Sequence, residues 1–247
     1  MIIGGREQPA TWDGESVLDA SGRPHRMEDV VWLPPVRPGK MIGLALNFAD
    51  HADELGLKKP EVPAIFIKAP NTLLGHRGSI VYPEGVEYMH YEAELAVVIG
   101  RACRKVRAAD AWDVVGGYTV ANDVTVRDFV TNMFRPPVKP KGFDTFGPLG
   151  PWVVSTDEVG DPTRLEISTR VNGDLRQHGN TRDLIFGIPD IIEYLTAFMT
   201  LEPDDVILTG TPKGVSHIHP GDVVRCEVEG IGVLENTVVA EAGETRA

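Results

Sequence analysis

Residues 91–100 are Tyr91-Glu92-Ala93-Glu94-Leu95-Ala96-Val97-Val98-Ile99-Gly100, and this stretch decides the fold. Its second half is continuous apolar sequence rich in Val and Ile, which is typical of a strand buried on both faces. Glu92 and Glu94 stand at its beginning, and residues i and i+2 of a strand point to the same face. The two carboxylates are therefore expected to project side by side, where desolvated like charges repel unless a cation holds them.

A second stretch, residues 117–123, also predicts a strand that ends on a carboxylate, Asp123. If the two strands are neighbours, Glu92, Glu94 and Asp123 converge, and three oxygen ligands with open positions suit Mg²⁺ or Mn²⁺. The spacing also allows another interpretation, in which the glutamates lie on a solvated edge strand and Asp123 caps a helix over residues 125–133. The apolar run favours the metal interpretation, because it predicts a central strand.

The composition narrows the classes of function. The chain has 247 residues, a formal net charge of −12 and 42% hydrophobic residues, enough for one large domain with a small appendage. No basic stripe is visible, which argues against nucleic acid and anionic membrane surfaces as partners. Two cysteines are too few for a disulfide framework, and neither a signal segment nor a membrane-length apolar run is present. We therefore expect a cytoplasmic protein with a small anionic substrate held by individual Lys and Arg residues.

The order of the predicted elements gives a strand-rich α+β fold with few helices, without Rossmann or TIM-barrel alternation. Residues 1–39 are polar and broken by a Pro-rich linker, so we expect a small N-terminal segment there and the main domain over residues 40–247. Within the main domain, Asn172-Gly173 predicts a type I′ hairpin turn, and the apolar spacing of residues 188–199 predicts a helix.

A short helix is predicted after the strand at residues 41–46, with Asn47 as its N-cap and Gly56 at its end. It carries His51 and Glu54, which are three residues apart and share a helix face. A carboxylate bonded to one imidazole nitrogen raises the basicity of the other, so the pair has the pattern of a general-base dyad. The alternative is an ordinary polar surface helix.

Several loops carry candidate substrate contacts. Lys68 ends a predicted strand and either faces a site or extends its ammonium to solvent. The Pro/Gly-rich residues 135–148 predict a long loop, in which Lys139 and Lys141 share a face if the chain is extended. Residues 209–214 offer hydroxyl and backbone N–H groups to an anion, but without P-loop spacing.

Five motifs together resemble the fumarylacetoacetate hydrolase family over residues 40–239. They are Leu46-Asn47-Phe48-Ala49-Asp50-His51, residues 91–100, residues 117–123, Lys141-Gly142-Phe143-Asp144-Thr145 and Leu208-Thr209-Gly210-Thr211-Pro212. The resemblance implies a mixed β-roll, a homodimer or higher homo-oligomer, and bound Mg²⁺ or Mn²⁺.

The resemblance also assigns roles to residues. It implies that Glu92, Glu94 and Asp123 hold the metal, and that His51 and Glu54 form a catalytic dyad on a mobile lid helix. It makes Lys141 a catalytic lysine. The implied or weaker substrate-binding candidates are Thr145, Thr211, Arg127 and Lys68.

Met89-His90-Tyr91 and Arg135-Pro136-Pro137-Val138-Lys139 are similar to one branch of the family, the isomerase/decarboxylase of homoprotocatechuate catabolism. That branch acts on 2-hydroxyhepta-2,4-diene-1,7-dioate and 5-carboxymethyl-2-oxo-hex-3-ene-1,7-dioate, often as a tandem duplication, whereas this sequence has one unit. The resemblance thus implies a decarboxylase/isomerase that works through a metal-stabilised enolate. The alternatives are an acylpyruvate (fumarylpyruvate-type) C–C hydrolase, an oxaloacetate decarboxylase and, more remotely, a non-catalytic binding protein of the same fold.

Overall fold

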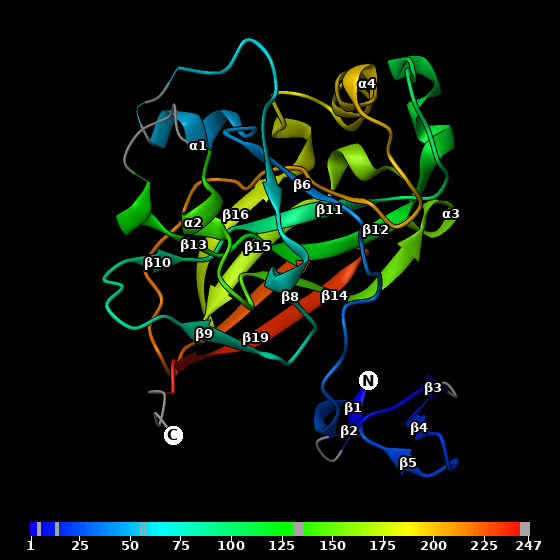
Figure 1. The fold of residues 1–247 in the computed structure, drawn as a ribbon, viewed down its shortest axis with the longest axis vertical. Coiled ribbons are helices and arrows are strands. Elements are labelled where there is room, and N and C mark those ends of the chain that lie inside the picture. The colour runs from blue at the N-terminus through cyan, green and yellow to red at the C-terminus, as the bar shows by residue number, and fades with distance from the viewer. Residues whose placement is uncertain (4–5, 13–14, 55, 57, 131–135, 243–247) are drawn as a thin grey trace.

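The fold is strand-rich α+β, as expected from the sequence. A computed structural model describes residues 1–3, 6–12, 15–54, 56, 58–130 and 136–242, without the side chains of residues 12 and 51–53. Two sheets curl around a common core to form the main body, and a small group of N-terminal strands lies at one end (Figure 1). Among the described residues, no helix is both long and apolar enough to cross a membrane.

The larger sheet has seven strands in the order β7-β6-β17-β11-β12-β14-β8. β17 runs parallel to β6 and β14 runs parallel to β8, whereas the other pairs are antiparallel. The bounds are β6 (Met41–Ala45), β7 (Ala64–Lys68), β8 (Leu73–Leu74), β11 (Ala93–Ile99), β12 (Val115–Asn122), β14 (Gly147–Ser155) and β17 (Val206–Leu208).

The smaller sheet has five strands in the order β16-β15-β18-β19-β9 and closes the other side of the roll. The turn between its first two strands is the predicted hairpin, with φ of +52° at Asn172 and +90° at Gly173, as a type I′ turn requires. The bounds are β9 (Ser79–Tyr82), β15 (Glu166–Val171), β16 (Asp174–Asn180), β18 (Val223–Val228) and β19 (Gly232–Ala240). Two further strands, β10 (Met89–His90) and β13 (Thr125–Val126), pair with each other.

Helices are few and short. The α-helices are α1 (Ala49–Glu54), α2 (Val138–Lys141), α3 (Thr156–Val159) and α4 (Ile188–Phe198). Short 3₁₀ turns are η1 (Met27–Asp29), η2 (Pro70–Thr72), η3 (Ala108–Val114), η4 (Arg127–Phe129), η5 (Pro162–Arg164) and η6 (Thr181–Asp183). The helix predicted over residues 188–199 is confirmed as α4, whose buried face includes Ile188, Ile191, Ile192 and Leu195.

The N-terminal strands have a core of their own. They are β1 (Ile2–Ile3), β2 (Arg6–Glu7), β3 (Ala10–Trp12), β4 (Val17–Asp19) and β5 (Pro24–His25). Ile3, Val17 and Val30 form an apolar cluster separate from the main core. Trp32 joins this part to the main body, because its ring packs edge-on against Trp152 and its backbone N–H donates to the carbonyl of His76.

β11 is the centre of the larger sheet, as its apolar run predicted. All seven of its residues are buried, and β12 and β17 pair with its two edges. Leu95, Val97 and Ile99 face the main core, whereas Ala96 and Val98 belong to a smaller apolar cluster on the opposite face. Glu94 shares the parity of Ala96 and Val98, so its carboxylate lies on the face away from the main core.

The structure differs from the sequence-based interpretation at three local points. The helix over residues 125–133, which belonged to the alternative interpretation of Asp123, does not form in its described part, where residues 125–126 are strand β13 and residues 127–129 are the turn η4. Asn47 does not cap α1, because its amide bonds the backbone of Phe186 and Thr209 and so fixes the turn before the helix. The long loop at residues 135–148 contains α2 in its described part, so Lys139 and Lys141 point apart. Lys139 lies over the ring of Phe129, and Lys141 is buried.

Candidate functional site

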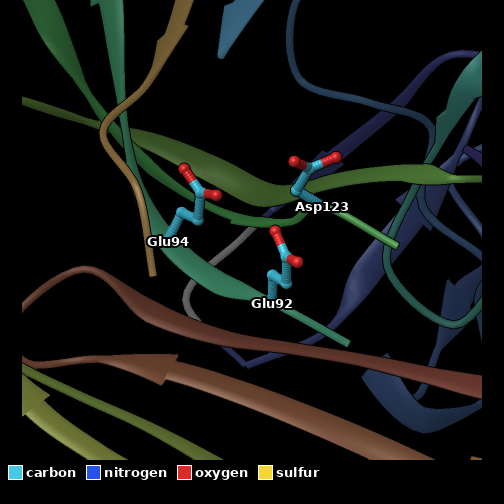
Figure 2. A group of neighbouring side chains, drawn as sticks. All are labelled: Glu92, Glu94 and Asp123. Carbon is cyan, nitrogen blue, oxygen red and sulfur yellow. The ribbon is translucent and has the colours of Figure 1, made fainter. Parts of the chain in front are cut away.

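Three carboxylates converge where β11 begins and β12 ends. Glu92 precedes β11, Glu94 lies within it, and Asp123 follows β12, whose Asn122 pairs with Ala93. The three side chains point toward one another (Figure 2), and one oxygen from each lies within 4.8 Å of the others. All three residues are at least 94% buried, with exposed fractions of 6%, 1% and 0%. The convergence predicted from the sequence is therefore confirmed, whereas the role of metal ligand stays a prediction.

In the described part of the chain, three cations contact these carboxylates. Lys68 Nζ lies 2.5 Å from Asp123 Oδ1, and Arg127 Nη2 lies 2.5 Å from Glu92 Oε1. Lys141 Nζ donates to Glu92 Oε2 at 3.0 Å, to Asp123 Oδ2, and to the Thr125 hydroxyl at 2.8 Å. These partners can take all three hydrogens of the Lys141 ammonium. The sequence analysis named Lys68, Arg127 and Lys141, and the structure brings all of them to one cluster.

Burial and charge shift the pKa values in this cluster. Burial, and then the charges of Asp123 and Glu92, raises the pKa of Glu94 well above its usual value, against the opposing effects of Lys141 and the Gly210 N–H. Burial lowers the pKa of Lys68. Burial also acts to lower the pKa of Lys141, but the attraction of Asp123 and Glu92 outweighs it and the pKa is raised. Glu94 is thus the carboxylate least compensated by neighbouring cations.

The residues present fit a hard divalent cation. Mg²⁺ and Mn²⁺ take oxygen ligands about 2.0–2.2 Å away, so ligand oxygens around one ion lie roughly 3–4.5 Å apart, close to the spacing found here. The donor set is all carboxylate, which such ions prefer over His or Cys donors. A cation at this point would also offset the repulsion that burial imposes on Glu94. Glu92, Glu94 and Asp123 are the residues that would hold it.

Gln177 ties the site to the second sheet. Its Nε2 donates to the Thr211 hydroxyl at 2.8 Å and to the Pro212 carbonyl at 2.7 Å, and its Oε1 accepts from Ala93 N and the Thr169 hydroxyl. Thr211 in turn donates its hydroxyl hydrogen to the Ala93 carbonyl at 2.8 Å. Thr211 therefore lies beside the glutamates, but its hydrogen is engaged with the backbone between them. Its predicted contact with substrate stays a prediction.

The remaining sequence candidates are placed as follows. Glu54 ends α1 and its Oε1 accepts the Gly214 N–H at 3.0 Å, which ties the helix to the loop after β17. The side chain of His51 lies outside the described residues, so the dyad with Glu54 stays a prediction. Thr145 has a φ of +69°, and its hydroxyl accepts from Val81 N at 2.9 Å. This contact joins Thr145 to β9 and not to the acidic cluster, and its substrate-binding role stays a prediction.

No site role was predicted from the sequence for two residues at the site. Gln177 lies in β16, where nothing in the sequence pattern sets it apart. Only its complete burial in the structure shows that it belongs to the site. His90 lies directly before the motif at residues 91–100, and its Nδ1 accepts from Arg127 Nε at 3.2 Å. Burial, and then the charge of Arg127, lowers the pKa of His90 to about 3. Neither residue had a spacing signal, because its partners come from distant parts of the chain.

Comparison with known proteins supports the resemblance. The family model described as "Fumarylacetoacetate (FAA) hydrolase C-terminal" matches residues 40–239. A protein of Salmonella dublin named "4-hydroxyphenylacetate degradation bifunctional isomerase/decarboxylase" is 51% identical over 216 residues, which are 87% of this chain and 50% of that protein. The chain thus spans about half the length of this curated relative.

Two solved structures share the fold. The 5-carboxymethyl-2-hydroxymuconate delta-isomerase from Mycobacterium smegmatis superposes with a TM-score of 0.82 at 41% identity, covering 95% of this chain and 94% of that one. The fumarylpyruvate hydrolase from Pseudomonas aeruginosa, solved in complex with Mn²⁺ and pyruvate, has a TM-score of 0.79 at 31% identity, covering 83% and 91%. These likenesses confirm the β-roll expected from the motifs.

Proposed function

The chain belongs to the fumarylacetoacetate hydrolase family, and on that premise we propose that it is a divalent-metal-dependent isomerase/decarboxylase. Its substrate is an unsaturated 2-oxo dicarboxylic or tricarboxylic acid of homoprotocatechuate catabolism. The observation that carries the proposal is the buried convergence of Glu92, Glu94 and Asp123 within 4.8 Å. The names of the Salmonella dublin and Mycobacterium smegmatis relatives support this reaction class.

The charge of the site favours an anionic substrate. Among the described residues, the three carboxylates and the three cations Lys68, Lys141 and Arg127 formally cancel, so a bound divalent cation adds two positive charges to a buried place. Such a site is complementary to a dianion, because an uncompensated charge is costly where water is scarce. When bound, Mg²⁺ or Mn²⁺ supplies a Lewis acid that favours the enolate form of a 2-oxo acid.

Of the three cations, Arg127 is the one best placed to meet the substrate's second carboxylate. Its side chain is 23% exposed, whereas those of Lys68 and Lys141 are 0% and 9% exposed. The two lysines are held by Asp123, Glu92 and Thr125 inside the cluster. We therefore assign Lys68 and Lys141 to holding the carboxylates in place and Arg127 to binding the substrate. The catalytic role expected for Lys141 and the substrate contact expected for Lys68 stay predictions.

Proton transfer is assigned to the helix α1. His51, tuned by Glu54, would move the proton that isomerisation relocates and that decarboxylation returns to carbon. The Glu54 contact with Gly214 N gives α1 an anchor beside the strand end that carries Thr211. A lid that closes on the bound acid would bring His51 into reach and exclude water.

The test is product analysis. The purified protein is incubated with the dicarboxylic and tricarboxylic acids of the homoprotocatechuate pathway and with a panel of 2-oxo acids and acylpyruvates, with Mg²⁺, Mn²⁺ or EDTA. Mass spectrometry and ultraviolet spectra should show loss of CO₂, or isomerisation without a change in mass, only when metal is present. Glu94→Gln serves as the matched inactive control. Addition of water with C–C cleavage would overturn the assignment, and failure to bind Mg²⁺ or Mn²⁺ in calorimetry would favour a non-catalytic protein.

His51→Ala separates the proposed reaction from C–C hydrolysis. Hydrolysis needs a base to activate water and should collapse in this variant, whereas decarboxylation should survive in part through the metal alone. Equal loss of every activity would contradict this distinction. The alternatives, acylpyruvate hydrolysis and oxaloacetate decarboxylation, are tested by the same panel.

We also propose a division of the chain at residue 39, with a small N-terminal part before a catalytic domain over residues 40–247. The separate cluster of Ile3, Val17 and Val30 and the start of the family match at residue 40 support this division. We further propose a cytoplasmic homodimer or higher homo-oligomer, which sedimentation of the full chain would test.

A further inference from the structure

We propose that His90 is a positioning residue that aims the guanidinium of Arg127 at the second carboxylate of the substrate. The inference rests on the proposed function, because it concerns the same acid and the same site. His90 Nδ1 lies 3.2 Å from Arg127 Nε, and Arg127 Nη2 lies 2.5 Å from Glu92 Oε1. His90 itself is only 4% exposed, so its ring is enclosed by protein.

Two contacts fix the plane of the guanidinium. Nε–H and the adjacent Nη2–H form one edge of that plane, and this edge meets His90 Nδ1 and Glu92 Oε1 together. With only one of these contacts, the group could rotate about the remaining hydrogen bond. With both contacts, the opposite end of the guanidinium keeps one direction. That end consists of Nη1 and the second hydrogen of Nη2. That end can bind a carboxylate through two parallel hydrogen bonds.

The contact also fixes the protonation of the imidazole. Nδ1 faces an N–H donor and must be the unprotonated nitrogen, so the ring hydrogen is on Nε2. Nε2 is buried and has no hydrogen-bond partner in the described part of the chain. The imidazole is therefore held in place by its acceptor contact and its packing, and a phenyl ring could fill the same space without accepting from Arg127.

The backbone around the pair is closely tied together. His90 is in β10, which pairs with β13, and Arg127 directly follows β13. Arg127 N donates to the Tyr88 carbonyl at 2.8 Å, and the Tyr88 ring packs edge-on against His90 with centroids 4.8 Å apart. The two side chains thus project from neighbouring elements that cannot shift independently. This rigidity is what a positioning residue needs in order to act through its partner.

A pair of unreactive ligands isolates this role. 2-Oxoadipate and 2-oxohexanoate have the same carbon chain and the same 2-oxo acid end, but only 2-oxoadipate has a second carboxylate. Their dissociation constants are measured by calorimetry in the presence of Mn²⁺ for the wild type and variants. We expect the wild type to prefer 2-oxoadipate, and His90→Phe to weaken 2-oxoadipate roughly tenfold while 2-oxohexanoate changes less than about twofold. His90→Asn, which keeps an acceptor near the position of Nδ1, should restore most of the affinity.

Coupling to Arg127 completes the test. If His90 acts only through Arg127, the double variant His90→Phe/Arg127→Gln should bind 2-oxoadipate as weakly as Arg127→Gln alone, and no weaker. Equal weakening of both ligands, absence of rescue by Asn, or additive losses in the double variant would overturn the inference. Thermal unfolding of each variant identifies any that fail to fold, and the Asn and Arg127 variants then decide the question. The reaction type is tested separately by product analysis, so a failure of the proposed function would be seen there and not here.

Discussion

Lys68 Nζ lies 2.5 Å from Asp123 Oδ1, so a completely buried ammonium is held against a carboxylate of the acidic cluster. The positive charge of Lys68 therefore lies beside the carboxylate that a metal ion would also contact. Lys68 stabilises Asp123 when no metal is bound, and it opposes the binding of a second cation nearby. The same residue therefore affects folding and metal affinity in opposite directions.

Replacing this lysine should make stability depend on metal. Lys68→Met leaves Lys141 as the cationic partner of Asp123 among the described residues. It should destabilise the metal-free protein by roughly 3 kcal/mol, or about 6–12 °C in a chain of this size. Mn²⁺ should then raise the melting temperature of the variant by more than it raises that of the wild type, because one opposing charge is gone. Differential scanning fluorimetry with EDTA and with Mn²⁺ measures both. Lys58→Met is the control, since Lys58 is exposed and its ion pair in the described part of the chain is with exposed Glu61. An equal metal response in Lys68→Met and wild type would contradict this account.

Glu94→Gln should separate stability from metal binding. The carboxylate is buried beside two others, makes no ion pair among the described residues, and accepts from Gly210 N at 2.6 Å, a contact that an amide oxygen can keep. Removing its charge should stabilise the metal-free protein by about 1–2 kcal/mol. Metal affinity should fall by more than the roughly 10- to 100-fold typical of a lost outer-shell partner. Urea unfolding and calorimetry test the two effects, with exposed Glu227→Gln as control. A variant that is less stable without metal would argue that Glu94 is already well compensated.

Gln177 should contribute strongly to the stability of the fold, because it is a buried polar side chain with several partners. Gln177→Leu leaves Ala93 N, the Pro212 carbonyl and two hydroxyl groups without this partner in a buried place, and should cost roughly 3 kcal/mol. The neighbouring His178 lies on the exposed side of the same strand, where it contacts Glu166. His178→Leu should change stability by less than about 0.5 kcal/mol. Chemical unfolding compares the two, and similar losses would show that the Gln177 contacts contribute little.

His76 should contribute to acid sensitivity. Burial, and then the charge of Arg77, lowers its pKa from 6.5 to about 4, and its Nδ1 accepts from Glu235 N at 3.0 Å. The unfolded chain therefore binds a proton more readily than the folded one, and stability is lost as the pH falls from about 6.5 to about 4. Allowing for solvent around the partly buried ring, the loss should be about 1–2 kcal/mol.

The measurement compares how the free energy of unfolding depends on pH in the wild type and in one variant. His76→Asn keeps an acceptor for Glu235 N but does not titrate, so its stability should fall less steeply than that of the wild type between pH 6.5 and pH 4. Above pH 7 the two proteins should show a constant difference. Parallel curves across the whole range would mean that His76 does not carry this dependence.

The sequence by itself determined the parts of the molecule that depend on short-range pattern. The apolar run at residues 95–99 predicted a central strand, and Asn172-Gly173 predicted the hairpin between β15 and β16. Glu92 and Glu94 were expected on one face because strand parity is local. The convergence of Asp123 with these glutamates was predicted only on the condition that β11 and β12 are neighbours, which they are. The motifs supplied the family and the β-roll.

Only the tertiary structure decided which polar groups meet. Lys68 and Asp123 are 55 residues apart, Gln177 reaches Ala93 across 84 residues, and Arg127 reaches His90 across 37. No spacing rule links such residues, since their distances depend on how the two sheets curl around one core. Local competition also reversed some predictions: the Asn47 amide bonds Phe186 and Thr209 instead of capping its helix, and a turn of helix separates Lys139 from Lys141. Buried polar groups must find partners wherever the fold supplies them, and the fold is a property of the whole chain.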